Sequence, residues 1–119
     1  MGKNTDTFFK ILRKDELRTA LMTAVYTGSP DDVRDGFIHF STASQIRGTL
    51  EKYFCGASVH ILAFKTDLFP ADQLKWEPSR GGALFPHLYG TLDVGLAHNQ
   101  WQIDIATDGT TTLPFPEEA

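Results

Sequence analysis

The chain has 119 residues, of which 41% are hydrophobic and 22% charged, and these values are typical of one globular domain rather than two. Its net charge of −4, from 15 acidic and 11 basic residues without a long basic run, argues against duplex DNA and membrane surfaces as partners, because both attract concentrated positive charge. The single cysteine, Cys55, excludes an intrachain disulfide. With no apolar leader at the N-terminus, we expect a cytoplasmic protein and, by default, a monomer.

The first two elements are predicted to be a strand and a helix. The segment Phe8–Leu12 is rich in aromatic and aliphatic residues and predicts the strand. The helix is expected to begin at Asp15, because Leu17, Leu21 and Val25, with Ala20 and Ala24 beside them, form one apolar stripe at three- and four-residue spacing.

A turn, a short strand and a second helix are predicted next. Turn residues at Gly28–Asp32 end the first helix, and Phe37–Phe40 reads as the strand. The second helix follows directly, with Thr42 as its N-cap and Gln45 completing a capping box. Gly56 is placed to end it.

The second half of the chain is predicted to be mostly strands. Ser58–Thr66 has apolar residues on both faces, which favours a central strand covered on each side. Leu74–Glu77 predicts a further strand, and the Gly- and Pro-rich segment Pro78–Gly90 predicts an irregular loop. Alternation over Ala97–Ala106 predicts a long strand, and a hairpin turn then leads to an edge strand at Thr110–Leu113.

This order of elements indicates an α+β fold, with two main helices packed on a mixed or antiparallel sheet. We expect a single domain over residues 8–113, with flexible tails at residues 1–7 and 114–119.

The strand-to-helix step at residues 37–42 is the first candidate site. If Ile38 and Phe40 point to the core, then His39 and Ser41 point to the opposite face. The amides that start the following helix, near Thr42, suit a phosphate or a carboxylate. The step therefore predicts His39 as a catalytic residue and Ser41 and Thr42 as ligand-binding residues. The competing interpretation is structural, with His39 hydrogen-bonded to a carbonyl and Thr42 serving as a helix cap.

The second candidate site is the loop over residues 76–90, which combines polar and aromatic side chains. These side chains are Trp76, Glu77, Ser79, Arg80, His87 and Tyr89. Ser79 and Arg80 are suited to hold an anion, and Trp76 and Tyr89 offer stacking faces. Glu77 is the candidate acid/base or ribose-binding group, and His87 either binds ligand or holds the loop shut. The competing interpretation is a surface loop pinned by its aromatics, with Glu77 and Arg80 as an ordinary ion pair.

Several well-known site types have no match in the sequence. There is no nucleophile elbow, no Walker loop and no dinucleotide-binding glycine fingerprint. The four histidines, His39, His60, His87 and His98, are widely spaced and form no paired zinc motif, so no metal site is predicted.

The two candidate segments also carry a family resemblance. Gly36–Thr42 and Trp76–Gly90 resemble the signatures of a bacterial domain-of-unknown-function family, number 952, over about residues 8–113. That family is similar to the ADP-ribosyltransferase-like fold, which includes RNA 2′-phosphotransferases. The resemblance implies that fold and a cleft formed by residues 37–42 and 76–90. A full His-Tyr-Glu or Arg-Ser-Glu triad does not match this chain in order, so the resemblance does not establish transfer from NAD.

Two functions therefore remain open. The leading hypothesis is a domain that binds or acts on a small anionic or nucleotide-like ligand, such as NAD, ADP-ribose or another phosphate-bearing molecule. If it is an enzyme, a transferase of ADP-ribosyl or phosphoryl type is expected, with His39 and Glu77 as catalytic residues and NAD as the candidate cofactor. The alternative is a non-catalytic protein- or metabolite-binding domain that keeps only the scaffold. A third interpretation is that both motifs serve folding alone.

Overall fold

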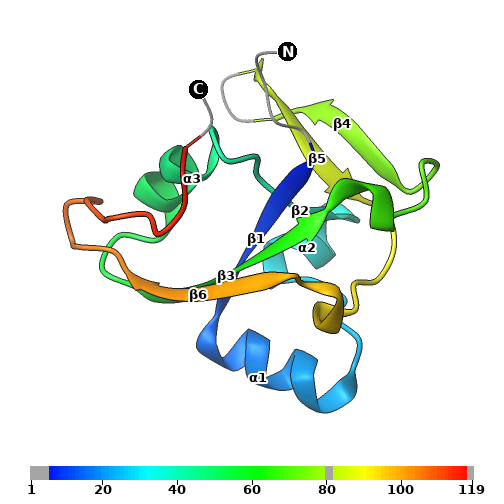
Figure 1. Cartoon of the computed structure of the whole chain (residues 1–119), viewed down its shortest axis with the longest axis horizontal. Coiled ribbons are helices and arrows are strands. Elements are labelled where there is room, and N and C mark those ends of the chain that lie inside the picture. The colour runs from blue at the N-terminus through cyan, green and yellow to red at the C-terminus, as the bar shows by residue number, and fades with distance from the viewer. Residues whose placement is uncertain (1–5, 80–81, 118–119) are drawn as a thin grey trace.

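A computed structural model describes residues 6–79 and 82–117 of the chain. Within this part, strands and helices are interleaved rather than grouped (Figure 1). The α-helices are α1 (Lys14–Thr23), α2 (Pro30–Asp35) and α3 (Ile46–Tyr53), and two 3-10 turns are η1 (Thr66–Leu68) and η3 (Val94–Leu96). The strands are β1 (Thr7–Arg13), β2 (Ile38–His39), β3 (Ser58–Lys65), β4 (Leu74–Pro78), β5 (Leu84–Leu88) and β6 (Asn99–Asp104).

The strands form two antiparallel sheets of three strands each. The first sheet has the order β1-β3-β6 and the second has the order β2-β5-β4. Phe9 of β1 connects the first sheet to the chain that leaves the second sheet. Its backbone N–H and C=O both form hydrogen bonds with the backbone of Ser41, just after β2. The α+β class and the antiparallel pairing agree with the sequence prediction, but the strands divide into two sheets instead of one.

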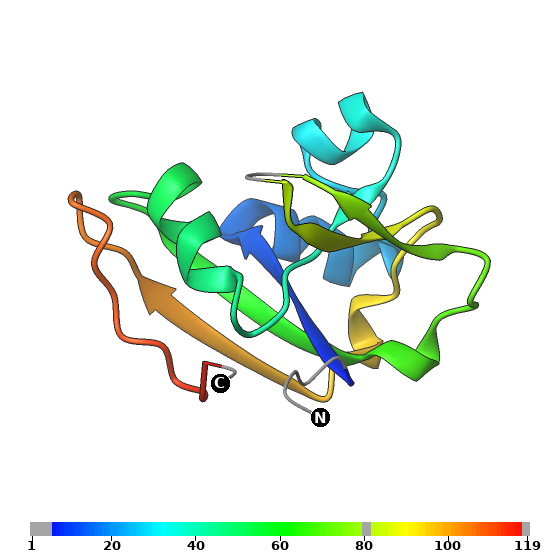
Figure 2. The ribbon, with the colours of Figure 1, turned by 90° about the horizontal axis from the view of Figure 1, so that it is seen from above.

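The first sheet is covered on both faces. One face, with Phe8 and Leu12, packs against α1 and the second sheet, and the other, with Phe9 and Ile11, packs against α3. In the view of Figure 2, α3 lies to the left of β1 and the second sheet lies to its upper right. The prediction of a central strand at residues 58–66 is confirmed, because β3 lies between β1 and β6 and contributes buried residues to both cores.

The first helix buries only part of the predicted apolar stripe. Leu17 and Ala20 are buried, but Leu21 is 64% exposed. Val25 lies beyond the helix, because α1 ends at Thr23 and Ala24 takes a left-handed conformation with φ of 64°. The predicted stripe is therefore confirmed at Leu17 and Ala20 and wrong at Leu21 and Val25.

The predicted turn at Gly28–Asp32 is wrong, because α2 begins inside it. Ser29 is the N-cap and accepts a hydrogen bond from the Asp32 amide, while the Asp32 side chain accepts one from the Ser29 amide. Pro30 occupies the first helical position, where its missing N–H costs nothing. Gly36 ends the helix with φ of 89°, a conformation that favours glycine.

The third helix begins later than predicted. It starts at Ile46 with Gln45 as its N-cap, so Thr42 is not the cap. Half of the predicted capping box is present, because the Thr42 amide donates to the Gln45 side chain at 3.0 Å. That amide is therefore already occupied, which removes it from the predicted anion site.

Two further predictions for the second half of the chain are wrong. The segment predicted as an irregular loop contains β5, the central strand of the second sheet. The Asp108–Gly109 turn is present, but Thr110–Leu113 forms no strand. Across this turn, the Ala106 amide donates a hydrogen bond to the Thr110 carbonyl at 2.9 Å.

Candidate functional site

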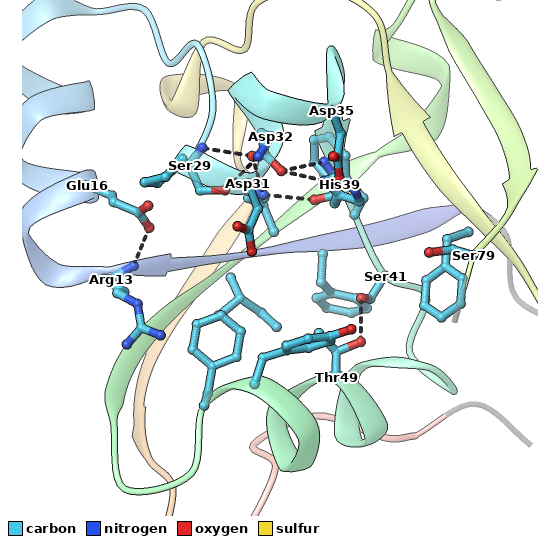
Figure 3. A pocket seen from close by; sticks show the side chains of 18 of the residues that line it. Arg13, Glu16, Ser29, Asp31, Asp32, Asp35, His39, Ser41, Thr49 and Ser79 are labelled. Carbon is cyan, nitrogen blue, oxygen red and sulfur yellow. Dashed lines mark hydrogen bonds and ion pairs between the residues drawn. The ribbon is translucent and has the colours of Figure 1, made fainter. Parts of the chain in front are cut away.

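A cavity of about 490 Å³ lies between β1, α2, β2 and α3. Figure 3 shows the carboxylates of α2 and His39 on one side and Thr49 of α3 on the opposite side, with Arg13 toward one end and Ser79 toward the other. The ionisable side chains that line the cavity are Lys10, Arg13, Glu16, Asp31, Asp32, Arg34, Asp35 and His39. This volume lies within the range typical of small-molecule sites.

The buried carboxylate of Asp32 is the centre of the hydrogen bonding. Its Oδ2 accepts from Lys10 Nζ at 2.8 Å and from the Ser29 amide at 2.9 Å. Its Oδ1 accepts from the His39 amide at 3.1 Å and lies 2.6 Å from His39 Nδ1. Burial alone would raise the pKa of Asp32, but the hydrogen bonds and the charge of Lys10 outweigh it and hold the pKa well below its usual range.

The imidazole of His39 is fixed by two carboxylates. Nδ1 contacts Asp32, and Nε2 lies 3.2 Å from Oδ2 of Asp35. Because an ionised Asp32 can only accept, Nδ1 carries a hydrogen. The two carboxylates therefore hold the ring in place. One third of the His39 side chain is still exposed, and it lines the cavity.

Local structure explains how these groups meet. The capping box at the start of α2 fixes Asp32, and one turn later Asp35 ends the same helix. The following glycine turn leads directly into β2, which carries His39. From the other side, Lys10 of β1 donates to both Asp32 and the His39 carbonyl, the latter at 2.9 Å.

The remaining charges are mostly paired within the protein. Arg34 contacts Asp31 at 3.2 Å and Asp35 at 3.1 Å. Arg13 has no carboxylate partner among the described residues, and its guanidinium lies over the Phe54 ring at 4.7 Å from the centroid. Arg13 is therefore the lining cation most available to an anionic group.

Ser41 and Ser79, both predicted to bind ligand, line this cavity. Ser41 is buried, and its Oγ lies 3.4 Å from Thr49 Oγ1. Phe85 and Tyr53 add aromatic surface to the lining. The cavity therefore joins parts of both predicted segments with residues from β1, α2 and α3.

Glu77, His87 and Tyr89 form a cluster beside the cavity rather than in its lining. The Tyr89 hydroxyl donates to Glu77 Oε1 at 2.7 Å, and His87 Nδ1 lies 2.8 Å from the same oxygen. Hydrogen bonds from Tyr89 and His87 lower the pKa of Glu77. The His87 ring lies 5.2 Å from the His39 ring, so the cluster contacts the site through its rings.

The other predicted site residues lie elsewhere. Thr42 is buried and its hydroxyl lies 3.2 Å from Ser44 Oγ, away from the cavity lining. Trp76 is 37% exposed and also does not line the cavity. Arg80 lies outside the described residues.

Sequence reasoning missed Asp32, Lys10, Asp35 and Arg13. Asp32 had a detectable signal, because Ser29-Pro30 followed by an acidic residue at the third helical position is a capping-box pattern. Lys10 had none, because a lysine in a strand is ordinarily on the surface and its contact with Asp32 spans 22 residues.

The described residues contain neither a metal-ligand cluster nor a membrane-spanning helix. No group of three or more histidine, cysteine, aspartate and glutamate side chains is arranged to hold a metal ion. No described helix is both long enough and apolar enough to cross a bilayer.

Comparison with known proteins places the chain in a family. The profile of DUF952, described as a protein of unknown function, matches residues 11–98. The crystal structure of CC0527 from Caulobacter crescentus is similar, with 37% identity, a TM-score of 0.82, and coverage of 89% of this chain and 93% of that one.

The solution structure of CC0527 agrees, at 38% identity and a TM-score of 0.76, covering 88% of this chain and 90% of that one. Curated proteins give no match. The chain therefore belongs to the DUF952 family.

Proposed function

We propose that the cavity between β1, α2, β2 and α3 binds a small nucleotide-like ligand, such as NAD, ADP-ribose or another phosphate-bearing nucleoside, and that His39 exchanges a proton with it. The observation that carries this proposal is the His39 imidazole, held between Asp32 and Asp35 at the wall of a cavity of about 490 Å³.

The arrangement suits general acid–base chemistry. A buried carboxylate that accepts from Nδ1–H fixes the tautomer and orientation of a histidine and stabilises its protonated form. Nε2 then either accepts a proton from a ligand hydroxyl or, once protonated, donates to Asp35. The hydrogen bond from His39 and the charge of Lys10 together hold the pKa of Asp32 well below its usual range, so Asp32 is ionised at neutral pH and this orientation persists.

The lining favours a ligand with hydroxyls, a ring and limited negative charge. Four carboxylates line the cavity beside three cations, and two of those cations are already paired. Carboxylates accept well from ribose hydroxyls, whereas Arg13 is placed for one phosphate group. Tyr53 and Phe54 offer rings for stacking against a base.

The edge of β1 adds a second recognition element. Phe9 exchanges its backbone bonds with Ser41, and the Arg13 amide donates to Glu16 at 2.8 Å. Ile11 lies between Phe9 and Arg13 in β1 and lines the cavity. An edge strand offers alternating donors and acceptors, which match a carboxamide such as that of NAD.

The ADP-ribosyltransferase-like fold belongs to the same proposal. Its support is the resemblance carried by Gly36–Thr42 and Trp76–Gly90 together with a cavity beside two packed antiparallel sheets. On this account, any enzymatic activity is of ADP-ribosyl or phosphoryl transfer type. Glu77 then acts through His87 rather than on the ligand directly.

Calorimetric titration tests the ligand class. We expect the wild-type chain to bind ADP-ribose, NAD and AMP, and His39→Asn to weaken all three at least tenfold. His98→Asn is the matched control, because it removes a histidine outside the cavity lining. Arg13→Gln should weaken AMP more than adenosine, since only AMP carries phosphate. Absence of binding heat for every ligand, or equal effects of His39→Asn and His98→Asn, contradicts the proposal.

A second assay separates an enzyme from a binding domain. Incubation with NAD should release nicotinamide if the site transfers ADP-ribose, and His39→Asn should abolish the release. Ligand binding with no turnover of NAD or of phosphorylated RNA supports the non-catalytic alternative instead.

A further inference from the structure

The outer face of the second sheet carries a second histidine directly opposite His39. His87 of β5 pairs with His39 of β2 in the antiparallel register, and their rings meet at 69° with centroids 5.2 Å apart. Phe37 stacks on the His87 ring at 4.1 Å and also contacts the His39 ring at 4.6 Å. His87 is only 2% exposed, although it is a polar residue beside a cavity that reaches solvent.

The two ring nitrogens of His87 have different surroundings. Nδ1 lies 2.8 Å from Glu77 Oε1, and because an ionised carboxylate only accepts, Nδ1 carries the hydrogen. Nε2 is buried and has no hydrogen-bond partner among the described residues. The neutral ring is therefore accommodated, whereas the protonated ring would bury an N–H that has no acceptor.

Within residues 6–79 and 82–117, no charged group accepts a hydrogen bond from His87 Nε2. Glu77 of β4 already accepts from Nδ1 and from Tyr89 of β5, and Lys75 of β4 is a cation whose Nζ lies 5.3 Å from the centre of the Tyr89 ring. The carboxylates of α2, Asp32 and Asp35, are bonded to His39.

These surroundings also affect the acidity of the ring. Burial lowers the pKa of His87 below its usual value, and the charge that His39 can carry lowers it further. The hydrogen bond to Glu77 acts in the opposite direction and does not offset burial. The neutral form therefore persists to more acidic pH than for an exposed histidine.

From this geometry we infer that His87 is a proton sensor that regulates the His39 site. While neutral, its ring fills the space between Glu77, Phe37 and His39 and keeps Phe37 packed against the His39 imidazole. Once protonated, the His87 ring leaves its buried position to hydrate Nε2, and Phe37 moves with it. The inference rests on the proposed function in one respect, because the site so regulated is the proposed ligand site.

The direct test is imidazole NMR on the full chain without ligand. Long-range proton–nitrogen spectra should show His87 as the neutral Nδ1–H tautomer at pH 7.5. On acidification below about pH 6.5, the ordinary histidine value, protonation of His87 should coincide with a change in the Phe37 ring resonances, before global unfolding. An Nε2–H tautomer, a charged ring at pH 7.5, or Phe37 resonances that do not follow His87 would overturn the inference.

Three variants assign the effect to His87. His87→Phe keeps a ring for Phe37 to stack on but cannot be protonated, so the pH-dependent change at Phe37 should disappear. His98→Gln removes a histidine elsewhere and should retain it. Glu77→Gln covers the case in which His87→Phe does not fold, because loss of the carboxylate should move the transition to lower pH. A transition unchanged in Glu77→Gln contradicts the inference.

Ligand binding then connects the sensor to the site. The affinity for ADP-ribose should fall in acid with the same midpoint as the His87 transition, and His87→Phe should lose that dependence. Absence of binding at any pH would contradict the proposed ligand, whereas the ligand-free spectra decide the inference independently.

Discussion

Four hydrogen bonds converge on the buried carboxylate of Asp32, and this carboxylate fixes both Lys10 and His39. Asp32→Asn would leave the buried Lys10 ammonium without its counter-charge. Removing one partner of a buried ion pair costs about 3–5 kcal/mol, so we expect the free energy of unfolding in urea to fall by about that amount. Asp31→Asn is the control, because its pair with Arg34 is exposed and should contribute below about 1 kcal/mol. Equal losses in the two variants would contradict this role for Asp32.

The same residue predicts a dependence of stability on acid. The pKa of Asp32 is lower in the folded protein than in the unfolded chain, so the unfolded chain takes up the proton first as pH falls. The stabilisation is complete above the ordinary aspartate value of about 3.9 and is lost as pH falls from there toward the folded-state value. Unfolding measured between about pH 5 and pH 2 should show a steeper decline for the wild type than for Asp32→Asn. Parallel profiles would rule out this contribution.

At the scale of single residues, the sequence predicts what local alternation determines. The burial of Ile38 and Phe40 and the opposite orientation of His39 follow from the two-residue period of a strand, and all three are observed. The contacts of Lys10 with Asp32 and of His87 with His39 join distant segments. Local pattern carries no information about them, so the partners of the predicted histidines could not be named.

The N-cap of α2 is the element that positions Asp32. Ser29→Ala removes the acceptor for the Asp32 amide and should lower the free energy of unfolding by about 1 kcal/mol, whereas Ser29→Gly should cost only a few tenths. Urea unfolding measures both. If the two variants lose equal stability, the cap hydrogen bond is not what matters at this position.

The end of α1 offers a stabilising substitution. Ala24 has φ of 64°, a left-handed conformation that costs a residue with a Cβ roughly 1–2 kcal/mol. Ala24→Gly should therefore raise the midpoint of thermal unfolding, while Ala20→Gly, in the buried helix face, should lower it. A lower midpoint for Ala24→Gly would contradict the assignment of strain to this turn.

At the scale of elements, the predictions for α2 and β5 were wrong because the same residues are compatible with both a turn and a regular element. The Gly-, Ser- and Pro-rich run before α2 reads as a turn, although the same residues form a capping box and a favourable first helical position. Pro86 argues against a central strand because it has no N–H, yet its carbonyl still accepts from the Phe40 amide at 3.0 Å and β5 pairs on both sides.

The C-terminal segment closes one side of the whole molecule. Phe115, within the segment predicted as a tail, stacks on Phe9 at 4.5 Å and contacts Trp101 at 4.8 Å, and Arg47 of α3 pairs with Glu117. Phe115→Ala should cost about 1–2 kcal/mol in unfolding free energy, since the ring is partly buried. Leu113→Ala, nearby in the same partly buried segment, is the comparison, because a leucine side chain is smaller than a phenylalanine ring and should lose less on truncation. A change within error for Phe115→Ala would show that this packing contributes little.

The fold class of the whole molecule was predictable, but the division into two sheets was not. Strand periodicity identifies which residues face inward, and that is why the double coverage of β3 was anticipated. Which strands pair is decided by contacts such as Ile38 with Leu88, far apart in sequence. The cavity depends on that pairing, because it lies where β2, α2 and α3 meet the edge of β1.

One measurement tests the central claim most directly: titration of the isotope-labelled wild-type chain with ADP-ribose, followed through backbone amide shifts. We predict saturable shifts that cluster around the cavity, at Arg13, His39 and Thr49, with smaller shifts at His98 and throughout β6. No saturable shift at millimolar ADP-ribose, or shifts confined to residues away from the cavity, would contradict the account.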